Sequence, residues 1–220
     1  MFEKEIVRRA LVAPEPQIAA DPSRPQAAVA VVLRDGADSA SGPEMLFIER
    51  AERRGDPWSG HMAFPGGRME TGDSGPQATA ERETWEEVGL VLAEADSLGR
   101  LDDLHGRHAG RPLPLVISAW VYHIEQCGPL ALNDEVEEAL WVPLDRIVDP
   151  RHQVEYPTPT AGYPGILVGR PERHIVWGLT YRFVELFLAR LGLPLPDRWT
   201  QAVKKGAGFD SSTFPQKGKS

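Results

Sequence analysis

The alternation of apolar and polar residues along the chain predicts a protein built from several short strands and three longer helices. Ala27–Arg34 is an apolar run typical of a buried strand, and Glu44–Arg50 alternates as a second strand, so the two are predicted to form a hairpin with a long loop. Gly178–Leu191 has apolar residues at helical spacing and predicts an amphipathic helix. The remaining predicted elements are strands at Leu98–Leu104, Leu113–Ile124, Glu135–Val142 and His174–Trp177, helices at Phe2–Val12 and about Pro76–Val88, and a short helical turn at Pro143–Ile147.

The order of these elements predicts the fold class. Strands precede and follow a single central helix, which favours an α/β (α+β) fold, a mixed β-sheet with helices on both faces. Residues 27–196 are predicted to form one domain, residues 1–26 a helix with a proline-rich connector, and residues 197–220 a flexible, polar tail. Three segments are predicted to be loops or turns: 51–63, 105–112 and the segment 154–168, which is rich in proline, glycine and tyrosine.

Composition narrows the class of protein. The 220 residues are 41% hydrophobic and 25% charged, an ordinary balance for a globular protein, and the net charge of −8 argues against binding to nucleic acid or to an anionic membrane. Cys127 is the single cysteine, which excludes an internal disulfide and a cysteine-based zinc site. The first residues lack the pattern of a signal peptide, and no apolar run approaches the roughly 18 residues of a membrane span. We therefore expect a cytoplasmic protein.

The stretch Phe64–Leu90 carries an unusual arrangement of charge. It reads F-P-G-G-R-M-E-T-G-D-S-G-P-Q-A-T-A-E-R-E-T-W-E-E-V-G-L, a loop followed by a helix with Ser74 as a candidate N-cap, Pro76 in the first turn and Gly89 at the stop. Near the end of this helix lie three glutamates, at positions 83, 86 and 87, where the helix dipole disfavours negative charge.

The three glutamates share an arc of about 100° on the helix, since successive residues are about 100° apart. Like charges at these spacings repel one another by a few tenths of a kcal/mol per pair. A compensating cation would relieve this repulsion, and hard oxygen ligands select Mg²⁺, Ca²⁺ or Mn²⁺. The alternative is a solvated acidic face with Arg82 as a local counter-charge.

These residues resemble a known family motif. Gly67, five residues, Asp73, eight residues and then R-E-T-W-E-E-V-G-L strongly resemble the Nudix box. The family pattern is glycine, five residues, glutamate, seven residues, Arg-Glu, an apolar residue, any residue, Glu-Glu, any residue, glycine and an apolar residue. The resemblance extends over about Ala27 to Leu191 and implies a hydrolase of nucleoside diphosphates linked to another group, with the α/β/α sandwich of the family.

The departures from the box resemble one branch of the family. Asp73 replaces a glutamate, the gap to Arg82 is one residue longer, and Thr84 stands where an apolar residue is usual. These features are similar to the branch that cleaves coenzyme A and its thioesters. Upstream, Arg50, Ala51, Gly60 and F-P-G-G match that branch, whereas the D-P-W-S-G-H loop at 56–61 differs.

The resemblance implies a metal site and a catalytic base. Glu83 and Glu87 are predicted to bind Mg²⁺ (or Mn²⁺) directly, with Glu86 as a third or water-mediated ligand and the Gly67 carbonyl completing the site. Glu135 is the first candidate for the general base, and it stands in an acidic stretch that could equally be a solvated edge. The alternative bases are Glu137, Glu138, Glu86 and Glu87.

The residues around the box are given supporting roles. Arg82 is expected to orient the glutamates by ion pairing, and Asp73 to fix the loop or the start of the helix. Arg50 could bind a substrate phosphate with two hydrogen bonds or be an ordinary surface arginine.

Aromatic residues near the box have open roles. His61 is a candidate for substrate contact, and Trp58 is either a stacking platform for a base or a buried loop anchor. Tyr156 and Tyr163 could line a substrate pocket, and Trp177 is expected in the core.

The first substrate hypothesis is therefore coenzyme A or acyl-coenzyme A, cleaved to 4′-phosphopantetheine and adenosine 3′,5′-bisphosphate. The alternatives are the same chemistry on ADP-ribose, dinucleotides, nucleotide sugars or (d)NTPs, and a non-catalytic Nudix-like ligand-binding protein. The expected partner is a small nucleoside diphosphate derivative, not a nucleic acid or a membrane. The terminal helices leave a homodimer open.

Overall fold

A computed structural model describes residues 4–19, 23–36, 42–55, 58–108, 111–157 and 162–195, without the side chains of residues 95, 107, 108, 111 and 112. The predicted tail at 197–220 lies outside these residues, as do Phe2 and two residues of the 51–63 loop, Asp56 and Pro57. In the described part of the chain, no helix is both long and apolar enough to cross a membrane.

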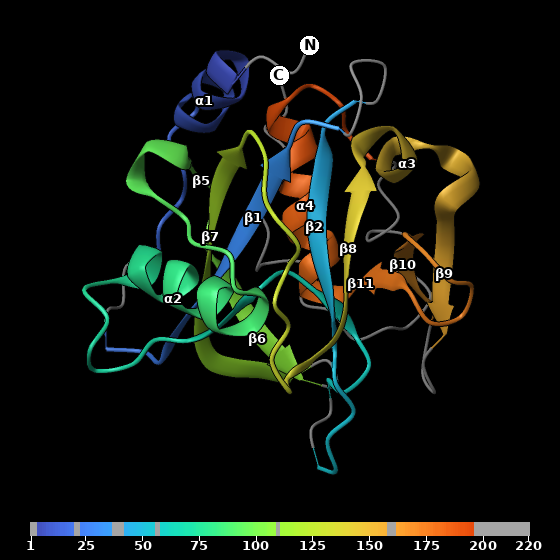
Figure 1. Ribbon diagram of the computed structural model, residues 1–220, viewed down its shortest axis with the longest axis horizontal. Coiled ribbons are helices and arrows are strands. Elements are labelled where there is room, and N and C mark those ends of the chain that lie inside the picture. The colour runs from blue at the N-terminus through green and yellow to red at the C-terminus, as the bar shows by residue number, and fades with distance from the viewer. Residues whose placement is uncertain are drawn as a thin grey trace.

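The described chain forms a large mixed sheet and a small second sheet (Figure 1). The large sheet has eight strands in the order β3-β2-β1-β7-β5, with β4 also paired to β1, β6 to β7 and β8 to β2. Its strands are β1 (Gln26–Arg34), β2 (Glu44–Arg50), β3 (Met62–Ala63), β4 (Gly66–Arg68), β5 (Ser97–Arg100), β6 (Leu104–His108), β7 (Arg111–Ile124) and β8 (Val136–Pro143). The second sheet, in the order β11-β10-β9, contains β9 (Gln153–Pro157), β10 (Gly162–Leu167) and β11 (Ile175–Trp177).

The large sheet is mixed because β1 runs parallel to β7 and antiparallel to β2 and β4. The predicted hairpin between the first two strands is present, with Leu33 opposite Met45. The helices are α1 (Lys4–Val12), α2 (Pro76–Val88), α3 (Leu144–Val148) and α4 (Gly178–Arg190), and short 3-10 turns lie at Glu94–Asp96 and Pro150–His152. The predicted fold class is confirmed.

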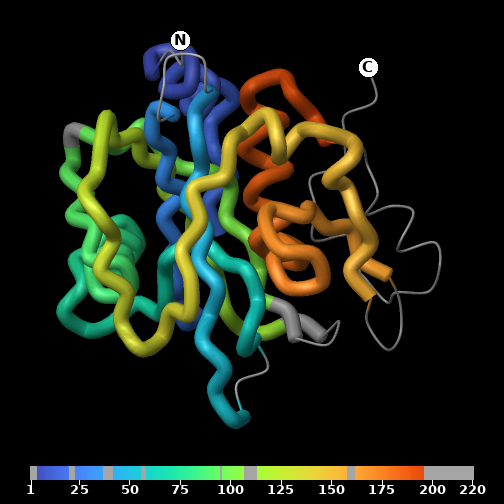
Figure 2. The backbone as a smooth tube through the Cα atoms, turned by 45° about the vertical axis from the view of Figure 1, so that its right-hand side comes forward, coloured from blue at the N-terminus to red at the C-terminus, as the bar shows by residue number. Residues whose placement is uncertain are grey.

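Alternation along the strands separates two cores, one on each face of the large sheet. In β2, Leu46 and Ile48 belong to the core that α2 covers, whereas Met45 and Phe47 belong to the core that α4 covers. Figures 1 and 2 show α2 on one side of the sheet, and α4 with the second sheet on the other. Side chains that are neighbours in one strand therefore point to different halves of the molecule.

The helix α2 has the predicted bounds, and both of its ends have a local cause. Pro76 occupies the first turn, and Gly89 ends the helix in the left-handed conformation at φ 68°, where its N–H donates to the Trp85 carbonyl. The N-cap is Gly75 and not Ser74, and no side chain caps this end. Thr84 is buried, and its hydroxyl bonds the Ala80 carbonyl at 2.6 Å, which lets a polar residue occupy an apolar position.

Three segments predicted to be loops or turns contain strands. The segment 154–168 forms most of β9 and β10, an antiparallel pair in which Tyr156 lies opposite Tyr163. Segment 105–112 contributes to β6 and β7, and segment 51–63 ends in β3. Proline and glycine suggested turns, but pairing with a neighbour decides strand formation more than composition does. Pro164 even lies within β10, the central strand of the second sheet.

Gly66 lies close against the backbone of β1. A Cβ atom at this position would meet the Ala28 carbonyl oxygen and lie 2.6 Å from the Val29 Cα, whereas at Gly72, in the following loop, nothing lies within 4 Å. We expect Gly66→Ala to cost about 3 kcal/mol of unfolding free energy and roughly 10 °C in Tm, and Gly72→Ala to leave Tm nearly unchanged. Thermal unfolding by circular dichroism measures both, and equal Tm values for the two variants would contradict the packing described.

Candidate active site

Gly66 and Gly67 begin β4, and the chain on both sides of this glycine pair is held to β1. The Ala30 N–H donates to the Pro65 carbonyl and the Met69 N–H to the Gln26 carbonyl, each at 2.9 Å. The Gly66 N–H points the other way and donates to Glu87 Oε2 at 2.9 Å. This hydrogen bond ties the last turn of α2 to the first residue of β4.

Glu87 is a buried carboxylate, only 2% exposed. Burial raises its pKa from the ordinary glutamate value of 4.5 to about 8, although the Gly66 N–H and the positive charge of Arg50 act in the opposite direction. The negative charges of Glu83 and Glu135 add to the upward shift of this pKa. A group in this position favours a proton or a cation beside it.

Glu83 lies against the second glycine of the pair. A Cβ atom on residue 67 would overlap the Glu83 carboxylate, lying 2.7 Å from Oε2, so a larger residue there would displace this side chain. Burial raises the pKa of Glu83, while an ion pair with Arg82 at 3.1 Å opposes that shift. The glycine pair and α2 together thus hold two desolvated carboxylates side by side.

Arg82 and Asp73 form the bridge between the loop and the helix. The Arg82 guanidinium donates Nε to Asp73 Oδ1 at 2.9 Å and Nη2 to Oδ2 at 3.1 Å, and it also bonds the Arg68 carbonyl. The hydrogen bonds from Arg82 hold the pKa of Asp73 well below its usual range. Asp73 Oδ2 further accepts from the Glu70 N–H and the Thr79 hydroxyl, so one carboxylate fixes both the loop and the first turn of α2.

Glu86 differs from its two neighbours in the box. Its side chain is 44% exposed and pairs with Arg82 at 3.1 Å. The Arg82 guanidinium therefore forms ion pairs with three carboxylates, those of Asp73, Glu83 and Glu86.

Arg50 and Glu135 approach the same place from β2 and from the residue before β8. The Ala51 N–H bonds the Glu135 carbonyl at 2.8 Å, and the Asn133 N–H bonds the Glu87 carbonyl at 3.1 Å. Both side chains influence the pKa of Glu87, which places them within electrostatic reach of it. The Glu135 carboxylate itself is half-exposed and pairs with Arg53 at 2.9 Å.

The other two acidic residues of this stretch face a different part of the molecule. Glu137 pairs with Arg173 at 3.5 Å, and Glu138 pairs with Arg170 and with His174. These partners lie in the segment before β11, which belongs to the second sheet.

His61 lies in a group of aromatic rings on the edge of the second sheet. Its ring centroid is 5.0 Å from that of Trp177, which stacks on Tyr156 at 4.1 Å with an angle of 9° and lies 5.9 Å from Tyr163. Trp177 is only half-buried there, although it was expected in the core. Trp58 is 42% exposed, so its interpretation as a buried loop anchor is wrong.

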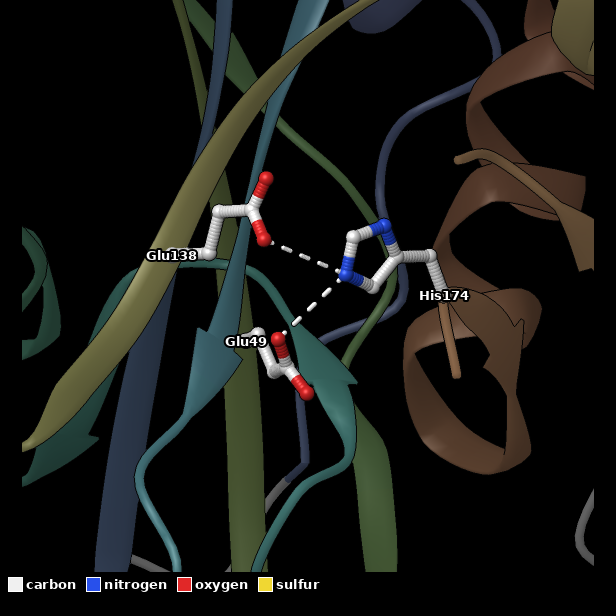
Figure 3. A group of neighbouring side chains, drawn as sticks. All are labelled: Glu49, Glu138 and His174. Carbon is white, nitrogen blue, oxygen red and sulfur yellow. Dashed lines mark hydrogen bonds and ion pairs between the residues drawn. The ribbon is translucent and has the colours of Figure 1, made fainter. Parts of the chain in front are cut away.

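A further cluster was not predicted from the sequence. Glu49, Glu138 and His174 offer ligand atoms that lie within 4.8 Å of one another, and Figure 3 shows the two carboxylates directed at the same imidazole nitrogen. Glu49 and His174 are 125 residues apart, so no local spacing signals this cluster.

The two carboxylate clusters differ in their fitness for a metal ion. Glu49 and Glu138 already have arginine partners, and the His174 Nδ1 accepts the Arg170 N–H at 3.0 Å, which leaves the proton on Nε2, facing the carboxylates. Glu83 and Glu87 are instead carboxylates with raised pKa values beside a glycine pair without Cβ atoms, an all-oxygen set that suits a hard divalent cation.

Comparisons with known proteins give the same family as the Nudix box in the sequence. The family model of the NUDIX domain matches residues 24–161. The human mitochondrial coenzyme A diphosphatase NUDT8 is 28% identical over 154 residues, which cover 68% of this chain and 63% of the relative. The uncharacterized protein C14C4.10c of Schizosaccharomyces pombe is 35% identical over 150 residues, 61% of this chain and 45% of the relative. The chain thus spans about half to two thirds of the length of these curated relatives.

A solved structure supports the fold. The MutT/nudix family protein from Enterococcus faecalis superimposes with a TM-score of 0.56 at 16% identity, covering 87% of this chain and 76% of that one. Because the family model matches more than half of the chain, the chain belongs to the Nudix family of hydrolases, which act on pyrophosphate bonds.

Proposed function

We propose that the chain is a divalent-metal-dependent diphosphatase that cleaves coenzyme A or acyl-coenzyme A to 4′-phosphopantetheine and adenosine 3′,5′-bisphosphate. The observation that carries this proposal is the pair of desolvated carboxylates, Glu83 and Glu87, packed against Gly66 and Gly67. The substrate class is supported by the box variant with Asp73 and by two relatives named as coenzyme A diphosphatases, human NUDT8 and mouse NUDT7.

Glu83, Glu86, Glu87 and the Gly67 carbonyl would hold Mg²⁺ or Mn²⁺. Such an ion, when bound, neutralises the diphosphate and makes water a better nucleophile. The chain's own contribution is to keep these ligands in place before substrate arrives, and Asp73 does this through Arg82, which contacts both Glu83 and Glu86.

Arg50 is proposed to bind a phosphate oxygen, because its positive charge already acts on Glu87 and therefore reaches the metal site. Glu135 is proposed as the general base. It would take one proton from the attacking water while the bridging P–O bond breaks, and its pairing with Arg53 fixes its position. Glu137 and Glu138 are engaged by Arg173, Arg170 and His174, which favours Glu135 among the three.

The proposed compartment is the cytoplasm, although NUDT8 and NUDT7 carry mitochondrial and peroxisomal names. Formation of a homodimer stays a prediction.

The substrate proposal is tested by a panel. The protein is incubated with Mg²⁺ and coenzyme A, acetyl-coenzyme A, ADP-ribose, NADH, UDP-glucose or dNTPs, and products are identified by mass spectrometry. We expect 4′-phosphopantetheine or its acyl form together with adenosine 3′,5′-bisphosphate. If coenzyme A stays intact while another compound of the panel is cleaved, the substrate is a different nucleoside diphosphate derivative. No cleavage of any compound would favour a ligand-binding role.

Glu87→Gln is expected to lower turnover at least a hundredfold, because it removes a metal ligand and a negative charge together. It should also stabilise the metal-free protein. The pKa of Glu87 is raised in the folded state, so its contribution to stability is lost as pH rises from about 4.5 towards 8. Near pH 7 the variant should gain on the order of 3 kcal/mol, roughly 10 °C in Tm.

Thermal unfolding with EDTA and with Mg²⁺ at pH 5 and pH 8 measures this effect. The wild type should lose stability between the two pH values without metal and regain it with Mg²⁺, and both changes should be smaller in Glu87→Gln, which keeps Glu83. Glu94→Gln, an exposed glutamate after α2, is the matched control and should behave as the wild type. A wild type whose metal-free Tm is unchanged between pH 5 and pH 8 would contradict the raised pKa.

Glu135→Gln is expected to lower kcat by about 10²–10⁴ while leaving the Mg²⁺-dependent rise in Tm intact, because a general base moves a proton without holding the ion. The matched control is Asp134→Asn, since Asp134 shares Arg53 with Glu135 but is almost fully exposed. Steady-state kinetics across pH distinguishes the two. A wild-type kcat in Glu135→Gln would transfer the role to Glu86 or Glu87.

A further inference from the structure

We propose that Arg170, Arg173 and His174 form a positioning clamp that holds the ends of β2 and β8 from behind and thereby sets Arg50 and Glu135 in the active site. This inference rests on the proposed function, since it assigns those two residues their catalytic tasks. Arg170, Arg173 and His174 together form this 170–174 clamp.

The clamp contacts β2 at Glu49, one residue before Arg50. Glu49 and Arg50 are consecutive residues of one strand, so their side chains point to opposite faces of the sheet. Glu49 follows Phe47 on the face that α4 covers, and Arg50 follows Ile48 on the face that α2 covers. Ion pairs that hold the Glu49 side chain therefore also fix the direction in which the Arg50 side chain points. They do so without any contact with substrate.

A β-bulge lies at the same level in the neighbouring strand. Glu49 is opposite Glu138, but Arg50 is opposite Val136, so Glu137 is an extra residue in β8. Val142 and Leu140 pack in the core under α4, and regular alternation would send Val136 there too. Val136 instead packs in the core under α2, so the bulge has inverted the alternation.

The bulge stands directly beside Glu135. Because it moves the chain by one residue relative to β2, the Glu135 carbonyl, not that of Val136, accepts the Ala51 N–H at 2.8 Å. The position of the proposed base relative to Arg50 therefore depends on the bulge being present and fixed.

The 170–174 clamp contacts every carboxylate on this level of the two strands. Arg173 donates Nε to Glu49 Oε1 at 2.5 Å and pairs with Glu137 at 3.5 Å. Arg170 pairs with Glu138. The His174 imidazole faces the carboxylates of both strands, with Nε2 at 3.3 Å from Glu49 Oε2 and 3.4 Å from Glu138 Oε2 (Figure 3). One segment thus bridges β2, β8 and the bulge residue.

Hydrogen bonds hold the backbone and the imidazole of the clamp in place. The His174 N–H donates to the Arg170 carbonyl at 3.0 Å, its carbonyl accepts the Val168 N–H at 2.9 Å, and its Nδ1 accepts the Arg170 N–H. Glu49 and His174 are both buried. A buried carboxylate tolerates loss of its partners poorly, so the strands and the clamp have one favoured arrangement.

A double-mutant cycle of Glu49→Gln and Arg173→Gln tests the clamp. Each single variant breaks the ion pair between Glu49 and Arg173, and the double variant removes both charges. If Arg173→Gln fails to fold because Glu49 is left buried without this partner, the double variant can still be measured. Three quantities are measured for each protein: kinetics on the compound that the wild type cleaves, the rise in Tm with Mg²⁺, and hydrogen exchange at the Arg50 and Ala51 amides.

We expect kcat/KM to fall on the order of ten- to a hundredfold in Arg173→Gln, with faster exchange at both amides and an unchanged Mg²⁺ shift in Tm. The Mg²⁺ shift separates positioning from general loss of structure, since the metal ligands lie on the other face. Arg173→Lys should restore part of the activity. Arg151→Gln removes an exposed ion pair with Asp149 and should match the wild type.

The clamp would be overturned if Arg173→Gln and the double variant had the kinetics and exchange rates of the wild type. It would also be overturned if the rise in Tm with Mg²⁺ fell together with kcat/KM. If the wild type cleaves no compound of the panel, the proposed function fails, and the exchange rates alone decide on the clamp.

Discussion

The burial of the Glu87 carboxylate against Gly66 and Gly67 is the interaction on which the site depends. A carboxylate in this position loses its hydration and keeps one hydrogen bond, from Gly66, in exchange. Glycine is required at position 66 because the β1 backbone occupies the space of a side chain, and at position 67 it leaves room for the Glu83 carboxylate. Loop, helix end and sheet therefore form a single unit, and Asp73 with Arg82 closes it on the solvent side.

The two faces of the sheet divide the work between them. The face under α2 carries the residues proposed for chemistry, and the face under α4 carries the ion pairs that support their strands. The division follows from strand geometry, since Arg50 and Glu49 differ only in the side to which they point. It is interrupted at the bulge, where Val136 changes sides, and this interruption lies beside Glu135.

The sequence predicted those parts of the fold whose causes are local. Pro76 and Gly89 bound α2, and the apolar run of β1 forms a strand in most contexts. Of the second sheet, β11 was predicted as the strand at His174–Trp177, whereas β9 and β10 were predicted to be a loop. Their strands depend on the pairing that sets Tyr156 opposite Tyr163. At the site, the helical spacing within the box predicted that Glu83, Glu86 and Glu87 lie on one side of α2. The Glu49–His174 contact joins residues 125 positions apart, and no property of either residue alone reveals it.

The raised pKa of Glu87 has a consequence for the lifetime of the protein. Unfolding to a state in which this carboxylate is hydrated releases the cost of its burial, so the chain without an ion is more often open at the end of α2. Open states are the substrates of proteases, and a ligand that binds only the folded state removes them by mass action. If the proposed ion binds there, its supply would govern how long each molecule survives as well as how fast it turns over.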